Sequence, residues 1–327
     1  MTILLLGGNG LLGHNVLQCL LRQGHTVHVV LRHPLLPEAG QFPHYGDRVT
    51  VFEGSILDDA TLLRAARGCE AVINCAGTTD MSLLRYEDYL AVNRDLCGRL
   101  VALMQQTGIT RMVHVSTANT IGCGSPDCPA DETAPPTPPF CHSYYARSKA
   151  GGEQIVLHAA EAHPEWHLVV VNPGFIVGPY DSKPSSGALL LAGYRRRVML
   201  APGGGKSFVA AVDAAEAVVN ALTMGRSGRR YLLTADSLSL RAFYLLQAET
   251  CGYRQRVITL PRALLHIAGG IGDLLRRCGV RTQLSTCNVR QLMASEYYDS
   301  HRARTDLGLP HTPLAAAIQD FHRTHHI

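Results

Sequence analysis

The first 22 residues constrain the fold of this chain more than any other segment. An apolar run at 2–6 is followed by three glycines spaced three apart, Gly7, Gly10 and Gly13, and then by an amphipathic stretch. Glycine allows a sharp turn, close approach of the backbone to a pyrophosphate, and tight packing of a helix on a strand. The N-terminus of the following helix would attract phosphates. The segment therefore predicts a strand, a dinucleotide-binding turn and a helix, although the spacing differs from the general GxGxxG fingerprint.

Strand-like and helix-like segments alternate along most of the chain. Strand-like runs lie at 2–6, 27–31, 49–52, 71–75, 112–116, 167–171 and 230–233, and helical patterns lie near 12–23, 59–67, 86–106, 145–162 and 211–223. This alternation predicts an α/β fold, a doubly wound parallel sheet of the Rossmann type with helices on both faces. The pattern loosens from residue 174. We therefore expect a dinucleotide-binding domain formed by 1–173 and 207–235, and a smaller C-terminal substrate-binding lobe formed by 174–206 and 236–327.

A tyrosine and a lysine near the middle of the chain are the strongest catalytic candidates. Tyr145 and Lys149 stand four residues apart in a helix-compatible segment, so their side chains would share one helix face. A phenol ordinarily titrates near ~10, and a neighbouring cation favours its ionised form. The pair can therefore serve as a general acid/base for an alcohol or a carbonyl. A surface tyrosine beside a solvated lysine is the alternative, and the spacing by itself does not exclude it.

Composition limits the classes of partner. The formal net charge is +4, and the basic residues are spread along the chain apart from one run at 195–197, so nucleic-acid binding is not indicated. No apolar run reaches the ~18 residues that an integral membrane segment needs. The ten cysteines form no CxxC pair, and no signal peptide is expected because the first strand starts almost at Met1. A cytoplasmic location with free thiols is the simplest interpretation.

Two further segments carry weaker signals. Cys123, Cys128, Cys141 and His142 fall in one loop region, but their spacing matches no common zinc pattern, so no metal is predicted. The stretch 263–275 contains three glycines and predicts an amphipathic or loosely packed helix near the mouth of the substrate site.

The glycine turn and the Tyr-x-x-x-Lys pair together resemble the extended short-chain dehydrogenase/reductase superfamily. The resemblance covers nearly the whole chain and is strongest to the NAD(P)-dependent epimerase/dehydratase family, in its dihydroflavonol-reductase-like group. Other matching stretches are Ala71-Val72-Ile73-Asn74-Cys75-Ala76-Gly77, Val113-His114-Val115-Ser116-Thr117 and Asn172-Pro173-Gly174-Phe175-Ile176-Val177-Gly178-Pro179.

The resemblance implies a bound nicotinamide cofactor. The residues it assigns to the cofactor are Gly7, Asn9, Gly10, Leu11, Leu12, Gly13, Arg32, Ser55, Ile56, Ala76, Gly77, Tyr145, Lys149, Pro173, Gly174 and Ile176. NAD enzymes usually carry an acid after the second strand, to bind the ribose 2′-hydroxyl, whereas Arg32 stands here and no acid follows until Glu38. Arginine suits a 2′-phosphate through forked, charge-assisted hydrogen bonds, so NADP(H) is expected before NAD. An exposed arginine capping the strand is the alternative. Ser55 replaces the family's adenine-binding Asp, which puts that contact in doubt.

The resemblance also implies catalytic roles. Thr117 would donate a hydrogen bond to the substrate oxygen, with Ser116 as the fallback, while Tyr145 transfers the proton. Lys149 would hold the nicotinamide ribose and support the tyrosinate. Asn93 matches a family asparagine, but a buried side chain bonded to nearby backbone explains it at least as well.

Two departures from the family narrow the reaction. Ala118 and Asn119 follow Thr117, where sugar 4,6-dehydratases carry an Asp-Glu pair, so dehydration by that route is not expected. Phe175 stands where many sugar-nucleotide epimerases carry an Asn that meets the diphosphate. We therefore predict an NADP(H)-dependent oxidoreductase that interconverts a ketone or aldehyde and an alcohol on a fairly apolar small molecule. The alternatives are a sugar (nucleotide) epimerase with tightly bound NAD and a non-catalytic dinucleotide-binding sensor. The resemblance further implies a homodimer through the helices at 86–106 and 145–162.

Overall fold

A computed structural model describes residues 1–32, 46–181 and 186–325 of the chain. Seven parallel strands form the main sheet, in the order β10-β6-β5-β4-β1-β2-β3. Their bounds are Thr2–Leu6 for β1, Thr26–Leu31 for β2, Val49–Glu53 for β3, Ala71–Asn74 for β4, Arg111–Val115 for β5, His167–Pro173 for β6 and Arg229–Leu233 for β10. Each corresponds to a strand expected from the sequence, so the doubly wound parallel fold is confirmed.

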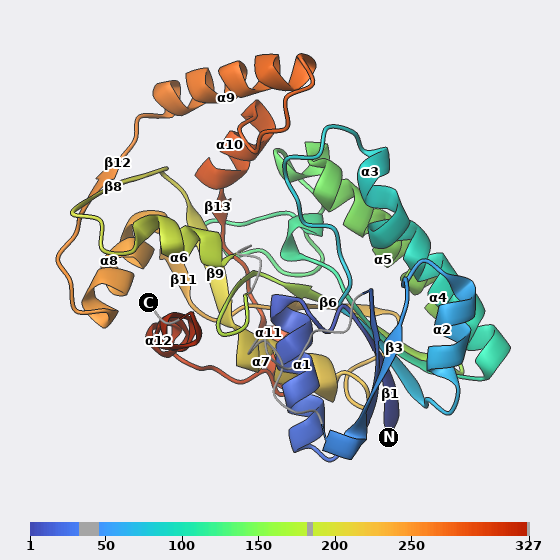
Figure 1. Ribbon diagram of the computed structural model, residues 1–327. Coiled ribbons are helices and arrows are strands. Elements are labelled where there is room, and N and C mark those ends of the chain that lie inside the picture. The colour runs from blue at the N-terminus through green and yellow to red at the C-terminus, as the bar shows by residue number, and fades with distance from the viewer. Residues whose placement is uncertain (33–45, 182–185, 326–327) are drawn as a thin grey trace.

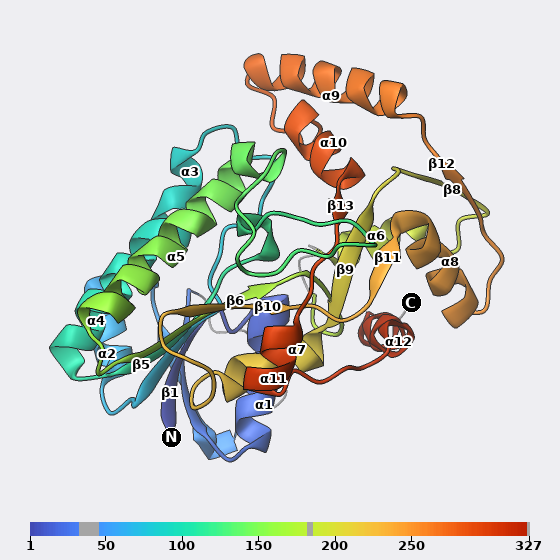
Figure 2. The same ribbon diagram turned by 180° about the vertical axis from the view of Figure 1, so that it is seen from behind.

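Helices cover both faces of this sheet (Figures 1 and 2). One face carries α1 (Leu11–Arg22), α7 (Ala211–Asn220) and α11 (His301–Leu307), and the other carries α2 (Asp59–Ala66), α4 (Leu96–Thr107) and α5 (Tyr144–Ala162). The apolar side chains of β1 alternate between the two faces: Ile3 and Leu5 pack in the first core, and Leu4 and Leu6 pack in the second. All four side chains are fully buried, which explains why β1 is apolar at every one of these positions.

The single helix expected at 86–106 is divided into three parts. A short helix α3 (Glu87–Leu90) continues into a π-helical turn at Ala91–Asp95, which leads directly into α4. Asn93 lies in the middle of this turn and is fully buried. Single π-helical turns inside α-helices often occur at functional sites. The turn packs on α5 through Gly152, where a Cβ would lie 2.2 Å from the Asn93 carbonyl oxygen.

A smaller sheet lies beside the main one and is built from segments far apart in sequence. Its central strand β9 (Gly205–Ala210) pairs with β7 (Phe175–Val177), β11 (Ser237–Ser239) and β13 (Ser295–Glu296). Three helices, α6 (Gly187–Gly193), α8 (Leu240–Thr250) and α12 (Leu314–Thr324), enclose an apolar cluster around it. The expected division into two lobes stays a prediction. After this sheet the chain returns to the main sheet, where α11 packs against β10 and α7.

The remaining elements extend away from the main sheet. Strands β8 (Val198–Ala201) and β12 (Arg256–Thr259) form a two-stranded ribbon, followed by α9 (Arg262–Arg277) and α10 (Thr286–Met293). Helix α9 runs along the outer edge of the molecule, with α10 beneath it (Figures 1 and 2). The helix expected at 263–275 is therefore present. Within the described residues, no helix has both the length and the apolar character needed to cross a membrane.

Candidate active site

The glycine turn after β1 is held in a conformation that other residues could not adopt. Gly7 has a φ of +77°, and a Cβ there would lie 2.7 Å from the Ala76 amide nitrogen. A Cβ on Gly13 would lie 2.0 Å from the Gly7 carbonyl oxygen. Gly10 caps the N-terminus of α1 and is exposed together with Asn9. The turn therefore brings α1 close to β1 and leaves the helix N-terminus open for an anion.

The other cofactor candidates gather at the carboxyl end of the main sheet, where ligands of such folds bind. Arg32 is exposed after β2, and Ser55 and Ile56 are half-buried after β3. Ala76 and Gly77 follow β4, and Pro173 ends β6. Gly174 lies between β6 and β7, and Ile176 lies in β7. Leu11 and Leu12 begin α1. The Ser55 hydroxyl accepts a hydrogen bond from the Leu57 amide at 3.1 Å. Glu38 lies outside the described residues, and the cofactor roles stay predictions.

Lys149 lies one helical turn after Tyr145 on α5, in a pocket of backbone carbonyls. Its Nζ donates to the carbonyl oxygen of Val115 at 3.0 Å and to that of Ala76 at 3.2 Å. The side chain is only 3% exposed, and burial lowers the pKa of its ammonium group. A Cβ on Gly77 would lie 3.0 Å from Nζ. The lysine thus joins α5 to the ends of β4 and β5, beside the predicted cofactor residues.

Tyr145 and Thr117 meet at this edge of the sheet. Burial raises the pKa of the Tyr145 phenol, and a side-chain hydrogen bond with Thr117 acts in the opposite direction. The sequence led us to expect that Lys149 would lower this pKa. That lowering is not found: Lys149 is not among the groups that shift this pKa, and its ammonium group donates to two backbone carbonyls. Thr117 is buried and also accepts a hydrogen bond from the Asn119 amide at 3.3 Å. Tyr145 therefore interacts with Thr117, whereas the ammonium group of Lys149 is bonded to the backbone.

Sequence reasoning missed a buried carboxyl behind this pair. Glu153 lies one turn after Lys149, and its Oε1 accepts hydrogen bonds from Thr120 Oγ1 at 2.6 Å and from Asn172 Nδ2 at 2.5 Å. Asn172 also donates to the Thr117 carbonyl oxygen at 3.1 Å. Burial raises the pKa of Glu153, while these hydrogen bonds lower it. The network fixes the backbone that carries Thr117. The spacing of Glu153 four residues after Lys149 places it on the same helix face, but it gives no sign of the partners on other elements.

Asn93 is a buried side chain that is hydrogen-bonded to nearby groups, as one of its two interpretations from the sequence predicted. Its side chain accepts a hydrogen bond from the Thr78 amide at 2.8 Å and donates to the Thr78 carbonyl oxygen at 3.0 Å. It also donates to Ser148 Oγ at 2.9 Å. The π-helical turn thereby holds the segment after β4 against α5, next to Lys149.

Phe175 faces apolar neighbours in the smaller sheet. Its ring meets the Phe208 ring edge-on, with centroids 5.4 Å apart, and Phe208 stacks on Phe243 at 4.7 Å. Phe175, at the position where many sugar-nucleotide epimerases are expected to carry an Asn, is therefore part of an aromatic cluster here.

The cysteine loop shows no arrangement for a metal. Cys123 and Cys141 are half-buried and Cys128 is exposed. Across residues 1–32, 46–181 and 186–325, no group of three or more His, Cys, Asp or Glu side chains could hold a metal ion. The absence of a metal stays a prediction.

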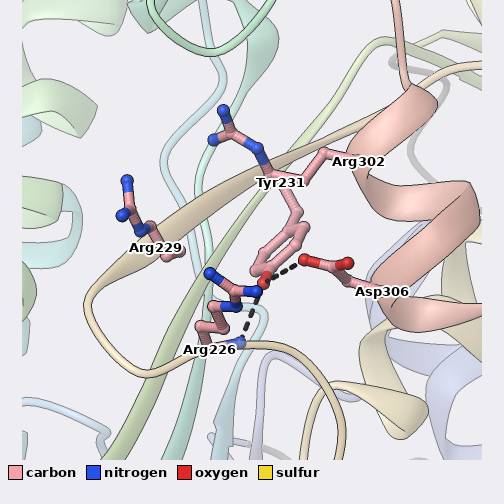
Figure 3. A pocket seen from close by; sticks show the side chains of 5 residues that line it. All are labelled: Arg226, Arg229, Tyr231, Arg302 and Asp306. Carbon is pink, nitrogen blue, oxygen red and sulfur yellow. Dashed lines mark hydrogen bonds between the residues drawn. The ribbon is translucent and has the colours of Figure 1, made fainter.

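A pocket of about 190 Å³ lies at the amino-terminal end of the main sheet, and Figure 3 shows the side chains that line it. It is lined by Arg226, Arg229, Tyr231, Arg302 and Asp306, near the start of β10. The Tyr231 hydroxyl accepts from the Arg226 amide at 2.8 Å and donates to Asp306 Oδ2 at 3.1 Å. None of the predicted catalytic residues lines this pocket.

Comparison with known proteins identifies the family. Residues 3–233 match the model of the NAD dependent epimerase/dehydratase family. A putative dihydroflavonol 4-reductase from Synechocystis sp. is 26% identical over 96% of this chain and 91% of its own length. The 4-hydroxy-2-methyl-3-oxo-4-farnesyl-3,4-dihydroquinoline-1-oxide ketoreductase of Stigmatella aurantiaca is 30% identical over 83% of this chain and 79% of its own.

Solved structures agree on the fold. A UDP-glucose 4-epimerase from Thermus thermophilus, solved as a complex with NAD, superimposes with a TM-score of 0.77 at 21% identity, covering 99% of this chain and 98% of the epimerase. The family match spans the glycine turn, Thr117, Tyr145 and Lys149. The chain belongs to the NAD dependent epimerase/dehydratase family, and it is an NAD(P)-dependent enzyme of the extended short-chain dehydrogenase/reductase type.

Proposed function

We propose that this enzyme transfers hydride between NADP(H) and the carbonyl or alcohol carbon of a fairly apolar small molecule. The observation that carries the proposal is the placement of Lys149, one turn after Tyr145 on α5, with its Nζ bonded to backbone at the ends of β4 and β5, just before Thr117. A phenol and a hydroxyl that meet in a buried site can both hydrogen-bond to one substrate oxygen.

The residues of the chain would divide the work as follows. Bound NADPH would supply the hydride, and after oxidation it would add a positive charge to the site. Tyr145 gives its phenolic proton to the substrate oxygen during reduction and takes it back during oxidation. Thr117 donates a hydrogen bond to the same oxygen and holds it in place. Lys149 binds the nicotinamide ribose and, through its bonds to the Ala76 and Val115 carbonyls, holds α5 and its Tyr145 against the sheet. The positive charge of an oxidised nicotinamide would favour the ionised phenol.

The fit of a dinucleotide rests on the turn after β1. Gly7 and Gly13 have no room for side chains, and the exposed Gly10 leaves the N-terminus of α1 accessible to a pyrophosphate. Arg32 stands exposed at the end of β2, where an arginine can bind the 2′-phosphate of NADP(H). The turn supports a dinucleotide of either kind, and Arg32 supports NADP(H) over NAD(H).

The apolar character of the substrate is supported by Phe175 and its aromatic neighbours. A ring in this place offers no hydrogen bond to a diphosphate and adds apolar surface to a pocket wall. The similarity to a ketoreductase that acts on a farnesyl-bearing quinoline oxide points in the same direction.

Kinetics with both cofactors test the proposal. A panel of ketones, aldehydes and alcohols with apolar substituents should yield turnover with NADPH or NADP+, and each turnover should release the cofactor. Epimerisation of a UDP-sugar by protein that retains NAD through purification would instead establish the epimerase alternative.

We further propose a reducing cytoplasmic location and a homodimer. All ten cysteines lie in the described part of the chain and are free, which suits a reducing compartment. The dimer, through α4 and α5, rests on the family resemblance.

A further inference from the structure

Helix α9 presents its large aliphatic side chains to solvent. Leu264, Ile267, Ile271 and Leu274 are 53%, 62%, 55% and 62% exposed. We call these four residues the α9 face. Their spacing of three or four residues places them on one side of the helix. Single exposed aliphatic residues are ordinary, but a continuous stripe of this kind marks a surface that binds something.

The residues on the opposite side of α9 are small or polar, and their contacts fix the orientation of the helix. A Cβ on Gly272 would lie 2.1 Å from the Leu284 carbonyl oxygen, and one on Gly269 would lie 2.9 Å from the Thr286 Cα. Asp273 accepts a hydrogen bond from the Thr286 amide at 3.1 Å. Larger side chains could not take the inward positions, so the α9 face cannot rotate into the protein without breaking these contacts.

Arg276, on the same inward side of α9, attaches the helix to the segment that follows β4. Its guanidinium donates to the carbonyl oxygens of Met81 at 3.2 Å, Leu83 at 2.5 Å and Thr282 at 2.7 Å. Exposure of the α9 face is therefore a feature of a specifically attached helix, as its place at the outer edge of the molecule also indicates (Figures 1 and 2).

The chain segment that carries the α9 face is strongly basic, and Asp80, from the loop after β4, interacts with Arg276 and Arg281 of this segment. Between residues 251 and 294 the chain carries seven arginines and a single acid, Asp273, and this acid is half-buried and bonded to Thr286. The six arginines other than Arg276 are exposed: Arg254, Arg256, Arg262, Arg277, Arg281 and Arg290. The neighbouring ribbon adds the exposed aliphatic residues Val198, Leu200 and Ile258.

We propose that the α9 face docks on an anionic lipid bilayer, with α9 lying in the plane of the interface. A helix with an aliphatic side and flanking arginines combines burial of apolar surface with attraction to acidic headgroups. A second copy of the chain fits this surface less well, because pairing two such faces would bring the arginines of both copies together.

The docking would place the bilayer beside the candidate active site. Through Arg276, α9 contacts the segment that follows β4. In α10, the Cys287 thiol contacts the Pro139 carbonyl oxygen at 3.8 Å, shortly before Ser143 caps the helix that carries Tyr145. An apolar substrate could then pass from the lipid to the site. This last step rests on the proposed function, whereas the docking itself does not.

Vesicle flotation of the full-length protein tests the docking without any activity measurement. The probes are vesicles of phosphatidylcholine alone and of equal parts phosphatidylcholine and phosphatidylglycerol. We expect flotation with the anionic vesicles. Replacing two members of the α9 face, Ile267→Ser with Leu274→Ser, should weaken it at least about tenfold. The matched control, Met224→Ser with Leu245→Ser, removes aliphatic side chains that are 40% and 36% exposed elsewhere and should change nothing.

A charge series provides the second arm. Arg277→Gln with Arg281→Gln should reduce binding to anionic vesicles about tenfold or more, at roughly 1 kcal/mol for each arginine, while the control Arg67→Gln has no effect. Thermal unfolding of each variant verifies that it folds. Failure of the unaltered protein to float, or equal flotation of the Ile267/Leu274 variant, would overturn the proposal. So would light scattering in which that variant turns a dimer into a monomer without any change in flotation.

Discussion

The Lys149 ammonium lies 3.2 Å from the carbonyl oxygen of Ala76, two residues after β4 ends in the middle of the main sheet. A second bond, to the Val115 carbonyl oxygen, holds the same ammonium group against the neighbouring strand. The helix that carries Tyr145 is therefore anchored at the sheet edge where the candidate cofactor residues gather.

Arg32 should determine the choice of cofactor. Loss of one charge-assisted contact typically costs about 1.5–3 kcal/mol, or roughly ten- to a hundredfold in affinity. Arg32→Ala should therefore weaken NADPH binding by that factor and leave NADH binding nearly unchanged, as measured by fluorescence titration. The control Arg67→Ala removes another exposed arginine and should affect neither cofactor. Equal affinity of the unaltered enzyme for NADPH and NADH would exclude this role of Arg32.

The glycine turn should tolerate no side chain at position 13. Gly13→Ala places a Cβ 2.0 Å from the Gly7 carbonyl oxygen, so the turn must open and binding of both cofactors should fall. Gly98→Ala is the matched control, because a Cβ on this helical glycine meets nothing within 4 Å. It should raise the free energy of unfolding by about 0.5–1 kcal/mol. Normal cofactor affinity in Gly13→Ala would contradict the assigned role of the turn.

UDP and UDP-sugars should bind poorly. Phe175 packs on Phe208 and offers the diphosphate no hydrogen bond, which an Asn would provide. Calorimetric titration should show no saturable binding at micromolar ligand. Micromolar affinity for a UDP-sugar would remove the argument for an apolar substrate and favour the epimerase alternative.

His14 should make the fold less stable in acid. Burial lowers its pKa from 6.5 to about 4, and its ring lies 4.0 Å from that of Tyr180. Because the unfolded chain binds the proton more readily, the stabilising contribution is complete above pH ~6.5 and is lost as the pH falls towards ~4. The loss should be on the order of 1–3 kcal/mol. Denaturant unfolding of the wild type and of His14→Gln between these pH values measures it, and identical pH dependence of the two proteins would refute the assignment.

The sequence allowed the main sheet and its helices to be predicted because each element is long and strongly patterned. The strands of the smaller sheet escaped prediction for the opposite reason. β13 has only two residues, and β9 finds its partners at residues 175–177, 237–239 and 295–296. Pairing across such separations leaves no local period in the sequence.

The candidate site was predicted unevenly. Tyr145, Lys149 and Thr117 belong to recognisable motifs, and the structure places them together. The hydrogen bonds of Glu153 with Thr120 and Asn172 depend on three separate elements meeting in space, and sequence spacing alone does not reveal that. The pKa of Tyr145 was expected to be lowered because the lysine was known only as a neighbour, whereas its ammonium group is directed at backbone carbonyls.

The central claim is that Tyr145 transfers the proton, and comparing two adjacent tyrosines tests it most directly. Tyr145→Phe keeps the ring but removes the transferable proton, whereas Tyr144→Phe makes the same change at a side chain that is 39% exposed. Steady-state kinetics on any accepted substrate should show a fall of about 10²–10⁴ in kcat for Tyr145→Phe, while this variant still binds NADPH. Tyr144→Phe should show near-normal turnover. Near-normal turnover in Tyr145→Phe would contradict the account and remove Tyr145 from the reaction.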